Sequence, residues 1–99
     1  MPYVSRDDRE NLDPIVDVAI RVLEKKSFQD SLGDLNYLFS RIIAGHMGTV
    51  SYGKIAMTTG VLENIKQEFY RRAAAPYEDM KIDLNGDIKE YRKSPTLDS

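Results

Sequence analysis

The sequence contains no cysteine and no tryptophan, and it has a single histidine, His46. Without cysteine it can form no disulfide framework, thiolate nucleophile or thiolate metal site. A histidine-based triad or zinc site would need partners for His46, and none has a recognisable spacing. These absences remove the commonest catalytic sets, so we expect no enzymatic activity and no cofactor.

The sequence also lacks an apolar run near the roughly 20 residues that a membrane-spanning helix needs. Its N-terminus passes from Met1-Pro2-Tyr3 into charged residues and shows no signal-peptide core. The net charge of −2 has no basic excess of the kind that nucleic-acid binding usually requires. We therefore expect a cytoplasmic protein that contacts no membrane and does not bind nucleic acid as its main task.

Apolar residues recur at three- and four-residue spacing in three stretches, which predicts three amphipathic helices. Asp13-Pro14 is typical of a helix start, and Asp34 can cap the second helix. Pro76 lacks a backbone donor and is expected to end or kink the third helix. The predicted helices cover residues 13–26, 34–45 and 51–75.

A change of periodicity follows the third helix. In Met80–Leu84 apolar and polar residues alternate, which is typical of a strand. Asn85-Gly86 suits a type I′ turn, and Ile88 and Tyr91 would lie on a returning strand. The predicted fold is mainly α, a three-helix core with a short C-terminal β-hairpin.

The length of 99 residues allows one core, so we predict a single domain over residues 1–91 and a flexible tail over 92–99. A domain of this size buries a small share of its surface and is marginally stable on its own. We therefore expect the chain to associate with itself as a homo-oligomer.

Tyrosines and basic residues gather in two places, on the predicted second helix and around the end of the third. Tyrosine rings can stack on a base, and arginine can hold phosphate through two hydrogen bonds. The pattern favours a nucleotide-like small molecule as ligand. The predicted ligand-binding residues are Asn36, Tyr37, Arg41, Lys66, Tyr70, Arg71, Arg72, Tyr77 and Lys81.

The same residues also have structural interpretations. Arg71 and Arg72 would complement the dipole at the end of a long helix, and the tyrosines would suit a subunit interface. Tyr37 and Arg41 are four residues apart and could form an intramolecular pair. Carboxylates repeated along the chain leave a third hypothesis open, a magnesium-dependent nucleotide hydrolase. Its candidate ligands are Asp13, Asp17, Asp30, Asp34, Glu78 and Asp79.

Short blocks of sequence occur in a fixed order along residues 1–91. They are Met1-Pro2-Tyr3, Leu12-Asp13-Pro14, Gly33-Asp34-Leu35-Asn36-Tyr37, Arg41, Gly60-Val61-Leu62-Glu63, Glu68-Phe69-Tyr70-Arg71-Arg72, Pro76-Tyr77-Glu78-Asp79, Lys81 and Asn85-Gly86-Asp87. In these blocks the chain resembles a family of short uncharacterised proteins, a domain of unknown function, found in tailed phages and bacteria. The chain departs from the family in a longer tail after Tyr91 and in the insertion-like segment Ser27–Leu32.

That family carries no agreed activity, so the resemblance implies a shared fold and a phage or prophage setting, but no chemistry. In such a setting the protein would act in the cytoplasm of the host cell. The leading hypothesis is an oligomeric binding protein, a phage sponge that sequesters a nucleotide-type signal of host immunity. The alternative is a protein–protein interaction module that acts on a host or phage protein.

Overall fold

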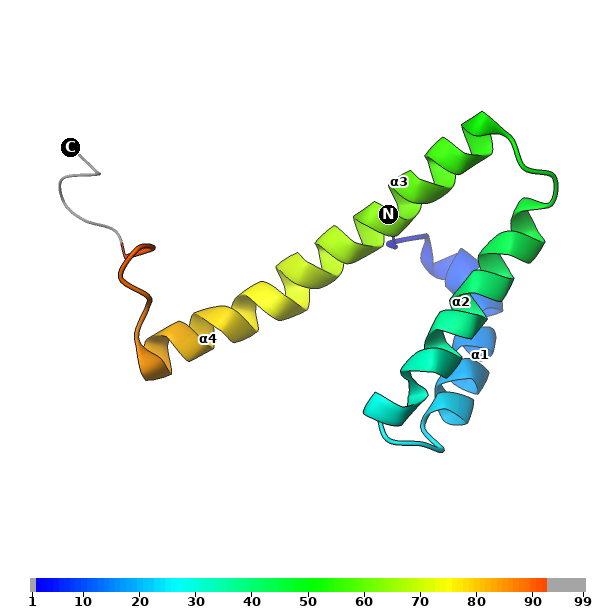
Figure 1. The fold of residues 1–99 in the computed structure, drawn as a ribbon. Coiled ribbons are helices and arrows are strands. Elements are labelled where there is room, and N and C mark those ends of the chain that lie inside the picture. Colours follow the sequence, from blue (N-terminus) through cyan, green and yellow to red (C-terminus); the bar gives the residue numbers. More distant parts are fainter. Residues whose placement is uncertain (1, 93–99) are drawn as a thin grey trace. The chain divides into compact units, whose positions relative to one another are not determined.

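The computed structural model describes residues 2–92 and is helical over most of that range (Figure 1). The mainly helical prediction is confirmed, and no strand occurs between residues 2 and 92. The elements are α1 (Arg6–Leu23), the 3₁₀ turn η1 (Gln29–Ser31), α2 (Leu32–Met47), α3 (Tyr52–Phe69), the π-helical turn η2 (Tyr70–Ala74) and α4 (Ala75–Asn85).

The chain divides into two compact units, Met1–Leu62 and Glu63–Ser99, which are described separately. Helix α3 begins in the first unit and ends in the second. The single domain expected over residues 1–91 stays a prediction. Residues 93–99 of the predicted tail lie outside the described residues.

Helix α1 begins at Arg6, well before the predicted start at residue 13. The Asp8 backbone N–H donates to the Ser5 Oγ over 3.3 Å, which makes Ser5 the cap of the helix. Pro14 was predicted at the first helical position, but it lies inside α1. The prediction was wrong because Ser5 and Asp8, three residues apart, form an earlier start signal that can outweigh the one hydrogen bond lost at a proline.

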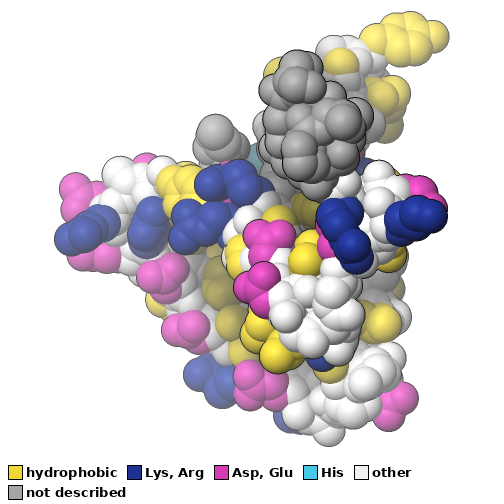
Figure 2. Space-filling model, turned by 90° about the vertical axis from the view of Figure 1, so that its left-hand side faces the viewer, with side chains coloured by type: hydrophobic (Ala, Val, Ile, Leu, Met, Phe, Trp, Pro, Cys, Tyr) yellow, Lys and Arg dark blue, Asp and Glu magenta, His cyan; other side chains and the backbone are white. Residues whose placement is uncertain are grey.

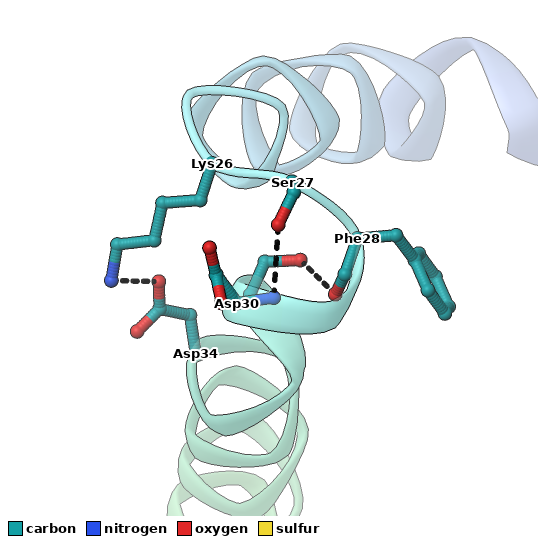
Figure 3. A network of polar contacts seen from close by, with 6 residues as sticks. Lys26, Ser27, Phe28, Asp30 and Asp34 are labelled. Carbon is teal, nitrogen blue, oxygen red and sulfur yellow. Dashed lines mark hydrogen bonds and ion pairs between the residues drawn. The ribbon is translucent and has the colours of Figure 1, made fainter.

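Polar contacts close the connection between α1 and α2 (Figure 3). The Ser27 Oγ accepts a hydrogen bond from the Asp30 N–H over 3.3 Å, and the Ser31 Oγ donates to the Phe28 carbonyl over 2.9 Å. Ser31 is 6% exposed and is the one buried residue in the described part of the chain. The connection is therefore organised by hydroxyl groups rather than by apolar packing.

An ion pair spans the same connection. The Lys26 Nζ lies 2.9 Å from the Asp34 carboxylate, and both side chains are about half exposed (Figure 3). Asp34 was predicted to cap α2, but the helix begins at Leu32 and Asp34 lies in its first turn. A carboxylate there still interacts favourably with the positive end of the helix dipole.

The turn between α2 and α3 is fixed by glycine and lysine. Helix α2 ends at Met47, and Gly48 follows with φ 66°, a conformation that favours glycine. The helix was predicted to end at residue 45, two residues before its observed end. The Lys54 Nζ donates to the carbonyls of Met47 and Thr49, each over 2.9 Å. Lys54 therefore ties the first turns of α3 back to the end of α2.

The backbone remains helical through Pro76, where the sequence predicted an end or a kink. Immediately before it, in η2, the Ala75 N–H donates to the Tyr70 carbonyl, a bond that spans five residues. A proline inside an α-helix has no N–H to donate, and its ring clashes with the carbonyl four residues earlier. The wider turn of η2 relieves that conflict, so α4 follows α3 and η2 without a break.

The predicted C-terminal β-hairpin is not present. Met80–Leu84 lies within α4, where its two ends occupy positions four residues apart on one helix face. Gly86, expected in a hairpin turn, has φ 85° and donates its N–H to the Ile82 carbonyl over 2.8 Å, which ends the helix. The N–H groups of Tyr91 and Arg92 both donate to the Ile88 carbonyl and form a turn instead of a strand.

No hydrophobic side chain between residues 2 and 92 is buried. Even large residues on the apolar helix faces are open to solvent: Ile15 is 64% exposed, Phe39 52% and Phe69 65%. Figure 2 shows hydrophobic side chains at the surface among charged ones. The helices were predicted to form a three-helix core, and between residues 2 and 92 their large apolar side chains remain at least partly exposed.

Candidate functional site

Three of the predicted ligand-binding residues lie on α2, in the unit Met1–Leu62. The Arg41 Nη1 donates to the Tyr37 hydroxyl over 3.0 Å, and the Arg41 guanidinium carbon lies 5.7 Å from the centre of the Tyr37 ring. The Asn36 Oδ1 accepts a hydrogen bond from the Ser40 hydroxyl over 3.3 Å. Each pair is four residues apart, the spacing that brings side chains together along a helix.

The contact between Tyr37 and Arg41 leaves most of the hydrogen-bond donors of Arg41 unused. Within residues 2–92 no ion pair joins Arg41 to a carboxylate. A guanidinium has five N–H donors, and the tyrosine hydroxyl takes one of them. Tyr37 is 60% exposed, so both the ring and the remaining donors face solvent.

The basic residues near the end of α3 have acidic neighbours. Arg71 forms an ion pair and a hydrogen bond with Glu68, three residues earlier, and Lys66 lies 3.8 Å from Glu63. Arg72 makes no hydrogen bond or ion pair with another residue in the described range. Two of the three cations in this group are thus already matched by carboxylates.

Tyr70 is bound to a carboxylate on the far side of the π-turn. Its hydroxyl donates to the Glu78 Oε1 over 2.6 Å, although the two residues are eight positions apart. This hydrogen bond, together with the charge of Glu78 and slight desolvation, raises the pKa of Tyr70 above its usual value of 10.0. The neutral, protonated phenol is therefore the favoured form of Tyr70.

Tyr77 and Lys81 form a second ring and cation pair, on α4. The Lys81 Nζ lies 5.6 Å from the centre of the Tyr77 ring. The arrangement repeats that of Tyr37 and Arg41, with the cation four residues after the ring. All the predicted residues are exposed, and the structure supports two separate groups, one in each unit.

The sequence interpretation missed the carboxylates that form ion pairs with these cations. Glu63 and Glu68 lie three residues before their basic partners, a spacing that could have revealed both pairs. The bond from Tyr70 to Glu78 could not have been found this way, because it depends on the π-turn. Carboxylates thus pair with Lys66 and Arg71, whereas Arg41 and Arg72 have no ion pair in the described residues.

Between residues 2 and 92 no three or more histidine, cysteine, aspartate or glutamate side chains are grouped so that they could hold a metal ion. None of the helices in that range combines the length and apolar character needed to cross a membrane.

Comparison with known proteins gives one match. A family model described as a domain of unknown function, DUF6899, matches residues 1–88. No curated protein and no solved structure matches the chain.

Proposed function

The chain belongs to the DUF6899 family, and on that premise we propose that it is a non-enzymatic helical protein that associates with itself and acts by binding. The exposure of most large hydrophobic residues on the helix faces carries this proposal. Soluble monomers rarely leave large contiguous apolar patches in water, and such patches mark interaction sites. A chain that is 41% hydrophobic and buries none of the hydrophobic side chains between residues 2 and 92 needs a partner to complete its core.

Native mass spectrometry of the protein purified from its expression host tests the proposal. We expect a symmetric oligomer as the main species, and any retained small molecule would add its own mass to that of the oligomer. A monomer that remains fully helical at micromolar concentration would contradict self-association.

A second candidate function is the binding of a nucleotide-type anion. The exposed ring of Tyr37 beside the guanidinium of Arg41 favours it, because no carboxylate in the described residues neutralises that cation. If the chain is encoded by a phage, as its resemblance to phage proteins suggests, such a site would let the oligomer sequester a nucleotide signal of host immunity in the host cytoplasm.

Titration calorimetry against linear and cyclic nucleotides tests this second candidate. Arg41→Gln should lower the affinity for any ligand found at least about tenfold, because it removes a charge-assisted contact. Arg21→Gln on α1 is the matched control and should leave the affinity unchanged. Absence of binding heat across the whole panel would contradict the candidate.

Two alternatives give other outcomes. A stoichiometric protein captured from a host lysate would favour an interaction module acting on a host or phage protein. Turnover of nucleoside triphosphates that a chelator abolishes would favour a magnesium-dependent hydrolase.

A further inference from the structure

One row of apolar side chains runs along the helical part of the unit Glu63–Ser99. This apolar row contains one residue from each successive helical turn of α3, η2 and α4. Its large members are 47% to 68% exposed, and no other element of this unit covers them. The apolar row consists of Ile65, Phe69, Ala73, Tyr77, Met80 and Leu84.

The π-turn keeps the apolar row straight. Leu84 follows Ile65 by 19 residues, and at about 100° per residue a regular α-helix would place the two roughly 100° apart around its axis. The turn η2, closed by the bond from the Ala75 N–H to the Tyr70 carbonyl, takes up one extra residue. That extra residue cancels the offset, so Tyr77, Met80 and Leu84 continue the line of Ile65 and Phe69.

The hydrogen bond from Tyr70 to Glu78 is independent evidence for this alignment. In a regular helix residues eight apart lie about 80° apart around the axis. Their 2.6 Å bond therefore indicates that the π-turn has brought both residues to one side of the helix. The same rotation acts on the apolar row.

Opposite charges flank the apolar row. By helical position Lys66 and Lys81 border one side, with two positive charges. Glu78 lies on that same side, which reduces its net charge to one positive charge. Glu68 and Asp83 border the other side with Arg72 between them, which leaves one net negative charge. When two copies of such a helix pair in parallel, the acidic side of each faces the basic side of the other; in antiparallel pairs, like sides meet.

We propose that a second copy of this chain covers the apolar row, with the two helices parallel and in register. The inference rests on the self-association proposed above and adds the surface and the orientation. Two observations support it: the continuous exposed row and the complementary flanks. Each member of the row meets its own copy across a twofold axis, as an isologous interface requires.

The proposal gives Tyr77 a structural role. As a member of the apolar row, it lies between the two copies with Ala73 and Met80 on either side of it along the helix. Tyr77 then contributes a buried ring to the interface, which is one of the interpretations that its sequence position allowed. The pair Tyr37–Arg41 on α2 stays outside the apolar row and remains open to a ligand.

Single cysteines test the arrangement, because the natural sequence contains none. A disulfide needs Cα atoms about 4.4–6.8 Å apart, which only facing positions provide. In the full chain, Met80→Cys and Leu84→Cys should each form a disulfide-linked dimer on mild oxidation, resolved on a non-reducing gel. Gln67→Cys, on the far side of the same helix, is the matched control and should remain mostly uncrosslinked. Circular dichroism verifies that each variant is helical.

The other outcomes overturn the proposal in distinguishable ways. A link that forms only when Ile65→Cys and Leu84→Cys proteins are mixed would show antiparallel pairing. An oligomer without links at Met80 or Leu84 would place the interface elsewhere, which contradicts this inference and leaves the proposed self-association intact. A helical monomer without links would contradict both.

Discussion

The two units differ in the contacts that their described residues make, since neither buries a hydrophobic side chain in that range. In the unit Met1–Leu62, side chains bind the backbone at both connections: Ser27 and Ser31 organise one, and Lys54 organises the other. In the unit Glu63–Ser99 close contacts join only successive parts of one helix, η2 and α4. Polar contacts therefore fix where the helices of the first unit end, while the apolar row of the second unit remains exposed.

The largest expected effect is on association through the second unit. Phe69→Glu places a charge in the apolar row and removes a ring whose burial contributes about 1.5–3 kcal/mol in each copy. We expect the dissociation constant of the dimer to rise at least about 100-fold, since the symmetric interface loses the ring twice. Size-exclusion chromatography with light scattering measures the change.

Gln67→Glu is the matched control, because it adds the same charge two residues away on the opposite side of the helix. It should leave the mass of the dimer unchanged. Equal behaviour of the two variants would mean that the apolar row is not the interface.

A one-residue insertion tests whether the π-turn acts by rotating the residues that follow it into line with those that precede it. An alanine inserted after Ala74 should rotate Tyr77, Met80 and Leu84 by about 100° relative to Ile65. We expect weaker association with undiminished helix content, measured by light scattering and circular dichroism. An alanine inserted after Asp87, beyond α4, should have no such effect. If both insertions left the dimer intact, the continuity of the row would be irrelevant.

Lys54 should carry more stability than an exposed lysine of the second unit. Lys54→Met keeps most of the side-chain stem but removes two hydrogen bonds to carbonyls, so it should lower the free energy of unfolding by about 1–3 kcal/mol. Lys66→Met breaks only an exposed ion pair and should cost less than about 0.5 kcal/mol. Urea unfolding followed by circular dichroism compares them, and equal losses would contradict the role given to Lys54.

The smallest effect concerns the ionisation of Tyr70. Because the fold raises its pKa, the bond to Glu78 contributes fully below pH 10 and is lost as the pH rises through the raised pKa. An ultraviolet titration of phenolate should show one late tyrosine, and Glu78→Gln should bring it back towards 10. Glu63→Gln should leave the titration unchanged. A titration that Glu78→Gln does not alter would mean that the bond is absent in solution.

The sequence predicted the helices best where the backbone itself dictates an end. The predicted end of the second helix at residue 45 lies close to the observed end at Met47, where Gly48 adopts a positive φ that suits glycine. The prediction for the C-terminal region was wrong because its sequence signals fit both a β-hairpin and a helix. Asn85-Gly86 suits a hairpin turn and equally a helix end, and the short alternation around Met80 also fits helical spacing.

The candidate site was predictable in part. The spacing of Tyr37 and Arg41 indicated their contact, and the structure contains it. The apolar row was not predictable as a unit, because residues before and after Pro76 fall into line only when a π-turn supplies one extra residue. A proline usually signals an end, and the sequence offers no separate mark that the backbone will widen instead.

The central claim is that the chain completes its core with a second copy of itself. Thermal unfolding followed by circular dichroism over a wide range of protein concentrations tests it most directly. For a chain whose folding is coupled to association, the melting temperature should rise by roughly a few degrees for each tenfold increase in concentration. A cooperative transition at the same temperature for every concentration would contradict the claim.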